Sequence, residues 1–176
     1  MFARAGWKTR SDGGHGAQLG IRRRALIAAV VLASGAGAAQ ACSENAVLIQ
    51  TETGTARFQV EVADTLRERG QGLMNVESMP MSAGMLFVYR FEQPVSFWMR
   101  NTLIPLDMIF LDRTGTIVTV HENAVPLDET PIFGGDSIQY VLEINGGLSS
   151  QLGIVPGDVL QHPAINQKRA AFPCGS

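Results

Sequence analysis

The sequence lacks the short motifs that identify many hydrolases and nucleotide-binding proteins. It contains no Gly-x-Ser-x-Gly segment, no His-Glu-x-x-His segment and no glycine-rich phosphate loop. Histidine is scarce, and neither His121 nor His162 has a second potential ligand at metal-binding spacing. From these absences we predict no catalytic residue and no cofactor.

Long apolar runs are also few. The one extended run, from Ala25 to Ala39, follows Arg22-Arg23-Arg24 and leads into Ala39-Gln40-Ala41. This order of basic, apolar and small residues marks a secretory leader, and the run is too short to cross a membrane. We therefore predict a signal peptide over residues 1–41 and a single domain over residues 42–176. That domain would be periplasmic or secreted, with no transmembrane anchor after the leader is removed.

Cysteine occurs only twice, at Cys42 and Cys174. There is no Cys-x-x-Cys pair and no histidine close to either residue in sequence, which disfavours a zinc or redox site. In an exported protein two cysteines are most simply joined, so we predict a Cys42–Cys174 disulfide. The alternative is a lipoprotein anchored at Cys42. It is disfavoured because Ala39-Gln40-Ala41 lacks the usual aliphatic residue and because Cys174 would stay unpaired.

Basic residues are in short supply after residue 41. Residues 42–176 contain 8 Lys and Arg against 15 Asp and Glu, which gives a net charge near −7. Nucleic-acid recognition needs a basic face, and anionic lipid attracts basic segments. The predicted domain is therefore not expected to bind nucleic acid or an anionic membrane.

Short segments with the two-residue period of β-strands alternate with turn residues in the rest of the chain. Residues 46–50 and 55–62 are predicted to form one hairpin, and residues 106–111 and 116–121 a second. Further strands are expected over 84–91, 97–99, 137–144 and 159–161, with a turn at 92–94 and a long loop at 122–136. Helical character is limited to residues 64–69, where Thr65 and Glu68 have capping-box spacing, and 148–152. The pattern predicts a mainly β fold with two short helices, as a sandwich or barrel.

The strand at 106–111 is apolar on both faces except for Asp107. A strand of this kind is usually covered on both sides, so a bare carboxylate there would be very costly. We expect Asp107 to have a hydrogen-bonded or cationic partner, with Arg100 nearest in sequence and Arg67 and Arg69 as other candidates. The simpler expectation is a structural role, in which the carboxylate lies at the end of the strand and caps a turn.

The segment before this strand gathers aromatic and polar side chains. With one acid from a later strand, it gives a candidate ligand-binding set of Trp98, Met99, Arg100, Asn101, Asp107 and Glu143. Aromatic walls with a few polar groups are typical of small-ligand sites. We therefore predict a non-enzymatic binding module, whose partner is a small molecule, a glycan or an envelope protein.

Two other functions are compatible with the same residues. A hydrolase-type enzyme would use Asp107, Glu143 and Asp158 as acid or base, with Arg100 holding an anion. A Cu(I) site would use the thioethers of Met74, Met85 and Met99 beside Trp98. Methionine more often fills gaps in a core than binds copper, so the metal hypothesis is the weaker one.

Several motifs in a fixed order resemble the DUF192 family (domain of unknown function 192), over about residues 46–161. The motifs are Arg69-Gly70-Gln71-Gly72-Leu73-Met74, Gly84-Met85-Leu86-Phe87, Phe97-Trp98-Met99-Arg100-Asn101-Thr102, Ile104-Pro105-Leu106-Asp107, Val141-Leu142-Glu143 and Gly157-Asp158. The resemblance implies a single-domain, β-rich, jelly-roll-like fold that is often exported, and it implies no activity. The chain departs from the family at Arg100, where Lys is common, and at Val76, where many relatives have Arg.

Overall fold

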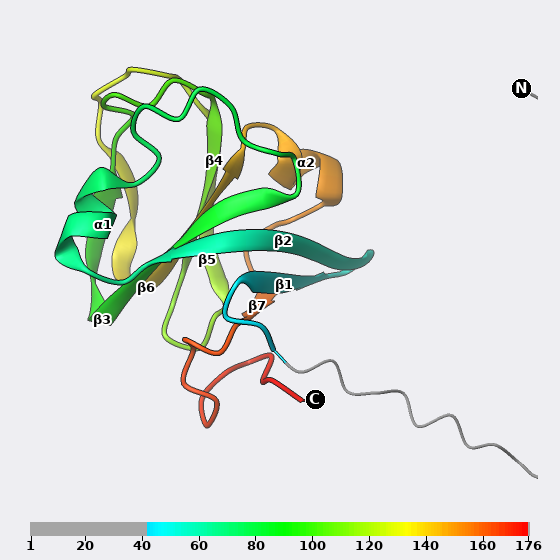
Figure 1. Cartoon of the computed structure of the whole chain (residues 1–176). Coiled ribbons are helices and arrows are strands. Elements are labelled where there is room, and N and C mark those ends of the chain that lie inside the picture. The colour runs from blue at the N-terminus through cyan, green and yellow to red at the C-terminus, as the bar shows by residue number, and fades with distance from the viewer. Residues whose placement is uncertain (1–41, 176) are drawn as a thin grey trace, which may run out of the picture. The chain divides into compact units, whose positions relative to one another are not determined.

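The structure is a computed structural model that describes residues 42–175, so the predicted leader lies outside the described residues. Seven strands and two short helices follow one another along the chain (Figure 1). They are β1 (Ala46–Thr51), β2 (Gly54–Ala63), α1 (Leu66–Gln71), β3 (Ala83–Phe97), β4 (Leu106–Leu111), β5 (Ile117–Ala124), β6 (Ile132–Asn145), α2 (Leu148–Leu152) and β7 (Val159–Gln161). No helix among these residues is long and apolar enough to span a membrane.

The strands form one sheet in the order β5-β4-β6-β3-β2-β1-β7. All neighbours are antiparallel except β2 and β3, which are parallel and are connected through α1. The sheet curls until its two edge strands meet at one point, a bridge between Thr116 and Val159. The result is a half-barrel, which confirms the predicted mainly β fold with two short helices.

Local sequence patterns account for several of these elements. Residues 46–51 and 54–63 form the predicted hairpin. Along β2, Phe58 and Val60 are buried and Arg57 is exposed, as the alternation in the sequence predicts. At α1 the Thr65 hydroxyl accepts from the backbone N–H of Glu68, and the Glu68 carboxylate accepts from the backbone N–H of Thr65. This capping box confirms the predicted helix start.

The core lies on both faces of the sheet, because β3, β4 and β6 are covered on two sides. The inner face packs residues that include Ile49, Phe58, Leu86, Ile109, Leu142 and Leu160. The outer face packs residues that include Met85, Phe87, Met99, Met108, Phe110 and Val141. Every residue of β4 is buried, which confirms that this strand is covered on both sides.

Two predicted boundaries are wrong. The predicted turn at 92–94 lies within β3, which continues to Phe97 with shifts in its register against β6, so Trp98 and Met99 begin a loop. The loop predicted at 122–136 is shorter, because β5 reaches Ala124 and β6 starts at Ile132. Gly134 lies inside β6, and the position requires glycine because a Cβ there would overlap the ring of Phe110. The glycine therefore serves close packing and not a turn.

Asp107 is fully buried, and its carboxylate is satisfied by the backbone. Oδ1 accepts from the N–H groups of Asn123 and Gly147, both at 2.8 Å, and Oδ2 accepts from the N–H of Ser149 at 2.7 Å. Gly147 is the N-cap of α2, so the carboxylate holds the start of this helix against β4 and the end of β5. The expectation of a hydrogen-bonded partner and a capping role is confirmed, whereas none of the suggested arginines is that partner.

The two ends of the described chain are joined by the predicted Cys42–Cys174 disulfide, which spans 132 residues of sequence. His162 Nε2 lies 3.0 Å from the carbonyl oxygen of Glu44, and Gln161 Nε2 donates to the carbonyl of Pro173 at 2.7 Å. A lipid anchor on Cys42 would use the same sulfur atom as the disulfide, so the two modifications exclude each other.

Replacing Asp107 by Asn should lower the free energy of unfolding by about 2–3 kcal/mol, because an amide NH2 would then face a buried backbone donor. Urea unfolding at pH 7 measures this change. The matched control is Asp136→Asn, an exposed position on β6 whose side chain accepts no hydrogen bond in the described structure. The control should change stability by less than about 0.5 kcal/mol. Equal stability of the two variants would contradict the structural role of Asp107.

Replacing both Cys42 and Cys174 by Ser should lower the free energy of unfolding by up to about 5 kcal/mol, because the unfolded chain is no longer constrained by a long loop. Chemical denaturation of the oxidised protein, the reduced protein and the double variant measures the effect. The reduced protein and the variant should agree. If reduction left the unfolding midpoint where it was, the disulfide would contribute no stability.

Candidate functional site

A hollow of about 190 Å3 lies between the outer face of the sheet and the segment that contains the end of α1. Residues 69–74 form one wall, and strand β3 contributes Phe87, Tyr89, Ser96 and Phe97 to the opposite one. Glu143 of β6 and the loop residues Trp98 and Thr102 complete the lining. We call this hollow the Glu143 pocket. It is assembled from three stretches of chain that are far apart in sequence.

Aromatic packing fixes the walls of the Glu143 pocket. The rings of Phe87 and Phe97 meet edge to face with centroids 4.9 Å apart, and Phe97 meets Phe110 in the same way at 5.8 Å. Gly72 has a φ of +46° and comes so close that an added Cβ would lie 3.2 Å from the Phe87 ring. Trp98 is 46% exposed, so its indole borders the pocket at the protein surface.

Arg69 is held in place by the backbone. Its Nη1 donates to the carbonyl of Asp64 and, at 2.9 Å, to the carbonyl of Val88. The guanidinium also lies over the ring of Tyr89, 5.0 Å from the ring centre. Two carbonyl contacts and one aromatic contact thus fix a cation in the wall of the pocket.

Glu143 is the unusual group of the pocket. It lies near the end of β6, directly between Met85 of β3 and Met108 of β4, and only 4% of its surface is exposed. Its carboxyl group makes no hydrogen bond and no ion pair with any residue between 42 and 175. The one sealed side-chain atom without a partner among these residues is Ser149 Oγ, so the Glu143 oxygens reach the open space of the pocket. Because this apolar setting disfavours the charged form, burial raises the pKa of Glu143 from an ordinary value of 4.5 to about 8.

The structure separates the predicted site residues. Trp98 and Glu143 line the same pocket, and Arg100 stacks its guanidinium over the Trp98 ring at 5.5 Å. Asn101 is exposed, and its Nδ2 lies 4.0 Å from the sulfur of Met74. Met99 is completely buried in the core of the outer face and does not line the pocket.

Asp107 is also outside the pocket, and the sheet register gives the reason. Asp107 pairs with Ile144, whereas Glu143 pairs with Met108, so the two acids belong to successive positions of adjacent strands. Successive side chains of a strand point to opposite faces. Asp107 therefore shares a face with Ile144, and Glu143 lies on the other face of the sheet.

The three acids proposed for a hydrolase do not line one pocket. Asp107 is engaged by three backbone donors, and Asp158 accepts from the N–H of Val155 at 2.9 Å. Glu143 is thus the only one of the three that lines the pocket.

The proposed copper ligands do not line one hollow, since Met74, Met85 and Met99 border three different ones. The described residues contain no group of three or more His, Cys, Asp or Glu side chains placed to hold a metal ion.

Sequence reasoning missed Arg69 as a member of the site, because it was considered only as a partner for Asp107. The available signal was the segment Arg69–Met74, which contains Gly70 in the last turn of α1 and Gly72 directly after the helix. Glycine at such a position permits close approach of the backbone to another element, and here the approached group is the Phe87 ring.

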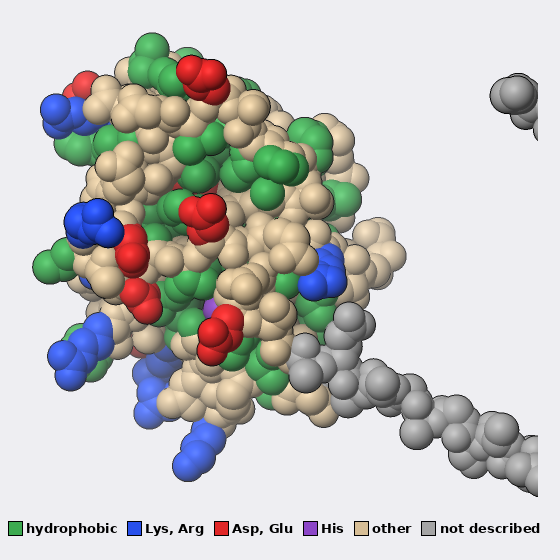
Figure 2. Space-filling model, viewed as in Figure 1, with side chains coloured by type: hydrophobic (Ala, Val, Ile, Leu, Met, Phe, Trp, Pro, Cys, Tyr) green, Lys and Arg blue, Asp and Glu red, His purple; other side chains and the backbone are tan. Residues whose placement is uncertain are grey.

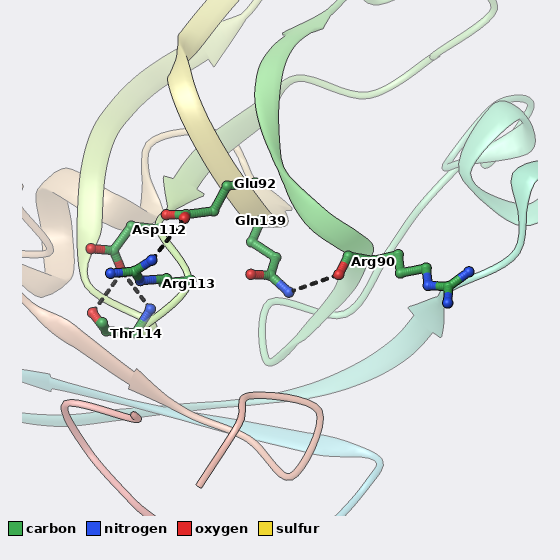
Figure 3. A network of polar contacts seen from close by, with 6 residues as sticks. All are labelled: Arg90, Glu92, Asp112, Arg113, Thr114 and Gln139. Carbon is green, nitrogen blue, oxygen red and sulfur yellow. Dashed lines mark hydrogen bonds and ion pairs between the residues drawn. The ribbon is translucent and has the colours of Figure 1, made fainter. Parts of the chain in front are cut away.

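A second hollow, lined by Arg90, Glu92, Arg113 and Gln139 among others, lies elsewhere on the surface. Figure 3 shows that Arg113 reaches Glu92, that Gln139 reaches the backbone of Arg90, and that the Arg90 guanidinium extends away from this network. The Arg113–Glu92 ion pair, at 3.5 Å, is partly exposed. Its members are already partnered at the surface, so this hollow has no counterpart to the unpaired carboxyl of Glu143.

Comparison with known proteins identifies close structural relatives. A protein of unknown function from Novosphingobium aromaticivorans DSM 12444 is 41% identical, with a TM-score of 0.64, and the match covers 65% of this chain and 82% of that one. A protein from Sinorhizobium meliloti 1021, provisionally called a transcription regulator, is 42% identical, with a TM-score of 0.67. That match covers 70% of this chain and 97% of the other.

A comparison with curated proteins gave no match. The model of the DUF192 family, described as "Uncharacterized ACR", matches residues 48–162. This range contains all seven strands, except for the first two residues of β1. It also contains every residue that lines the Glu143 pocket. The chain belongs to the DUF192 family.

Proposed function

We propose that the protein is a non-enzymatic binding module and that the Glu143 pocket takes a small organic molecule. The observation that carries this proposal is the carboxyl group of Glu143, which is buried and borders a cavity without any partner. Burying a polar group without a hydrogen bond costs several kcal/mol in most settings. A ligand that supplies the missing partner would recover part of this energy on binding.

The dimensions and walls of the pocket support a small ligand. A volume of about 190 Å3 is roughly six times the ~30 Å3 that a water molecule takes up in the liquid. This is the size of a single amino acid, and it favours a small molecule over a glycan chain or an envelope protein. The rings of Phe87, Phe97 and Trp98 would contact an apolar or aromatic body, while Glu143 would bind its polar group.

We further propose that the module works in the periplasm or outside the cell. The disulfide between Cys42 and Cys174 supports an oxidising compartment. The excess of acidic residues after position 41 does not favour nucleic acid as a partner. The hydrolase alternative receives no support from the pocket, because only one of its three proposed acids borders the cavity.

Replacing Glu143 by Gln should change how stability depends on pH. Because the pKa of Glu143 is raised from 4.5 to about 8, the folded state binds more protons than the unfolded state between these values. The contribution of Glu143 to the free energy of unfolding is therefore fully present below pH 4.5. It is lost as the pH rises toward 8, by up to roughly 1.4 kcal/mol per pH unit. Urea unfolding from pH 4.5 to 8.5 should show this slope in the wild type and lose it in Glu143→Gln. Glu122→Gln, an exposed strand position, should keep it, and a slope retained in Glu143→Gln would assign it to other groups.

Ligand binding can be followed through the indole of Trp98. The chain has two tryptophans, Trp7 and Trp98, so a full-length Trp7→Phe protein emits from Trp98 alone. Titration with fragment-sized compounds that carry a phenyl group and a polar head should give saturable changes in emission. Glu143→Leu should weaken the tightest response at least about tenfold, the loss of one buried polar contact, whereas Glu122→Gln should not. If no compound gave a saturable response, the pocket would not bind this class of ligand.

A further inference from the structure

An acidic and a basic side chain line the Glu143 pocket without pairing with each other. Glu143 contributes a carboxyl group from β6 and Arg69 a guanidinium from the end of α1. Among residues 42–175 the only ion pair within 4.0 Å is Arg113–Glu92, so Arg69 and Glu143 are farther apart than that. Both still act on Tyr89. Burial raises the pKa of its hydroxyl, the field of Arg69 opposes this rise and the field of Glu143 adds to it.

Arg69 has donors left for a ligand. Only its Nη1 is engaged, with the carbonyls of Asp64 and Val88, whereas the guanidinium as a whole carries five N–H donors in a planar fork. The contact with the Tyr89 ring and the two carbonyl contacts hold it in position before any ligand arrives. A fixed guanidinium with free donors is suited to a carboxylate or another small oxyanion.

Glu143 requires a partner of the opposite sign or a hydrogen-bonding group. Its direct neighbours across the sheet are Met85 and Met108, whose thioethers cannot donate a hydrogen bond. Ser96 and Thr102 line the same pocket and offer hydroxyl oxygens as further acceptors. An ammonium group has three donors, which matches one carboxylate and two hydroxyl oxygens.

We propose that the ligand of the Glu143 pocket is a small zwitterion with an apolar side group, such as a free amino acid. Its ammonium group would contact Glu143, its anionic group would contact Arg69, and its side group would pack among Phe87, Phe97 and Trp98. This inference rests on the proposed function and adds the charge class of the ligand. The pocket has the volume of a single amino acid, and its lining offers an acidic group for the ammonium end of the ligand and a basic group for the anionic end.

Binding of an ammonium group to Glu143 has a consequence for protons. Among the described residues, the titratable side chains that line the pocket are Arg69 from α1, Tyr89 from β3 and Glu143 itself, while β4 presents Met108. Burial raises the pKa of Glu143 to about 8, so at pH 7 the free pocket holds a neutral carboxylic acid. An ammonium ligand must therefore displace roughly one proton when it binds, whereas a neutral ligand displaces none.

Four probes with the same phenyl body separate the ligand classes: phenylalanine as the zwitterion, 2-phenylethylamine as the cation, 3-phenylpropanoate as the anion and 3-phenylpropan-1-ol as the neutral compound. They are titrated into the full-length Trp7→Phe protein, with calorimetry in two buffers of different ionisation enthalpy to count protons. We expect phenylalanine to bind at least about tenfold tighter than 3-phenylpropan-1-ol. Its affinity should rise up to tenfold per pH unit between pH 6 and 8, with roughly one proton released at pH 7.

Two variants assign the ends of the ligand. Glu143→Gln should remove the proton release and flatten the pH dependence, and Arg69→Lys should weaken phenylalanine and 3-phenylpropanoate while leaving 2-phenylethylamine unchanged. Arg90→Gln, at an exposed position outside the pocket, is the control.

The proton count and pH profile of the wild type decide the question even if a variant fails to fold. Binding of 3-phenylpropan-1-ol as tight as phenylalanine, without proton release, would overturn the zwitterion and leave the binding function intact. Absence of binding by all four probes would overturn both.

Discussion

The structure depends on one constraint, namely that β3, β4 and β6 are covered by apolar side chains on both faces. A carboxylate on these strands has little access to bulk water, so its charged form is disfavoured unless it finds a partner. Asp107 and Glu143 meet this constraint in opposite ways. Asp107 accepts three backbone hydrogen bonds and fastens α2 to the sheet. Glu143 accepts none and borders a cavity, which is the basis of the proposed ligand site.

Much of the fold follows from local sequence patterns. The first hairpin follows from strict alternation in residues 55–62, and the start of α1 follows from the capping box of Thr65 and Glu68. The need of Asp107 for a partner follows from its apolar neighbours. Boundaries were less predictable, because Gly134 reads as a loop residue and yet lies in β6, where the Phe110 ring leaves no space for a Cβ. Such a packing requirement involves residues distant in sequence and leaves no local trace.

The site was predicted in part, and register explains the remainder. Trp98 and Glu143 do line one pocket, whereas Asp107 and Met99 do not. Whether Asp107 and Glu143 share a face depends on a single residue of register between β4 and β6, which no periodicity within one strand determines. Arg69 enters the pocket only because the connection from β2 to β3 folds α1 over the outer face of the sheet, as Figure 1 shows.

Figure 2 shows basic side chains on that side of the molecule and acidic ones on the face in view. Three motif segments of the DUF192 resemblance, 69–74, 97–102 and 141–143, meet at the pocket.

The central claim is that Glu143 is a buried carboxylic acid without an internal partner. The most direct test is the titration of its own side chain, followed by the 13C chemical shift of the carboxyl carbon in protein labelled at glutamate. The signal is assigned by its loss in Glu143→Gln. The account predicts a midpoint near pH 8, in agreement with the effect of burial on its pKa. A midpoint near the ordinary 4.5 would show that water or an internal donor already satisfies the group, and would contradict the account.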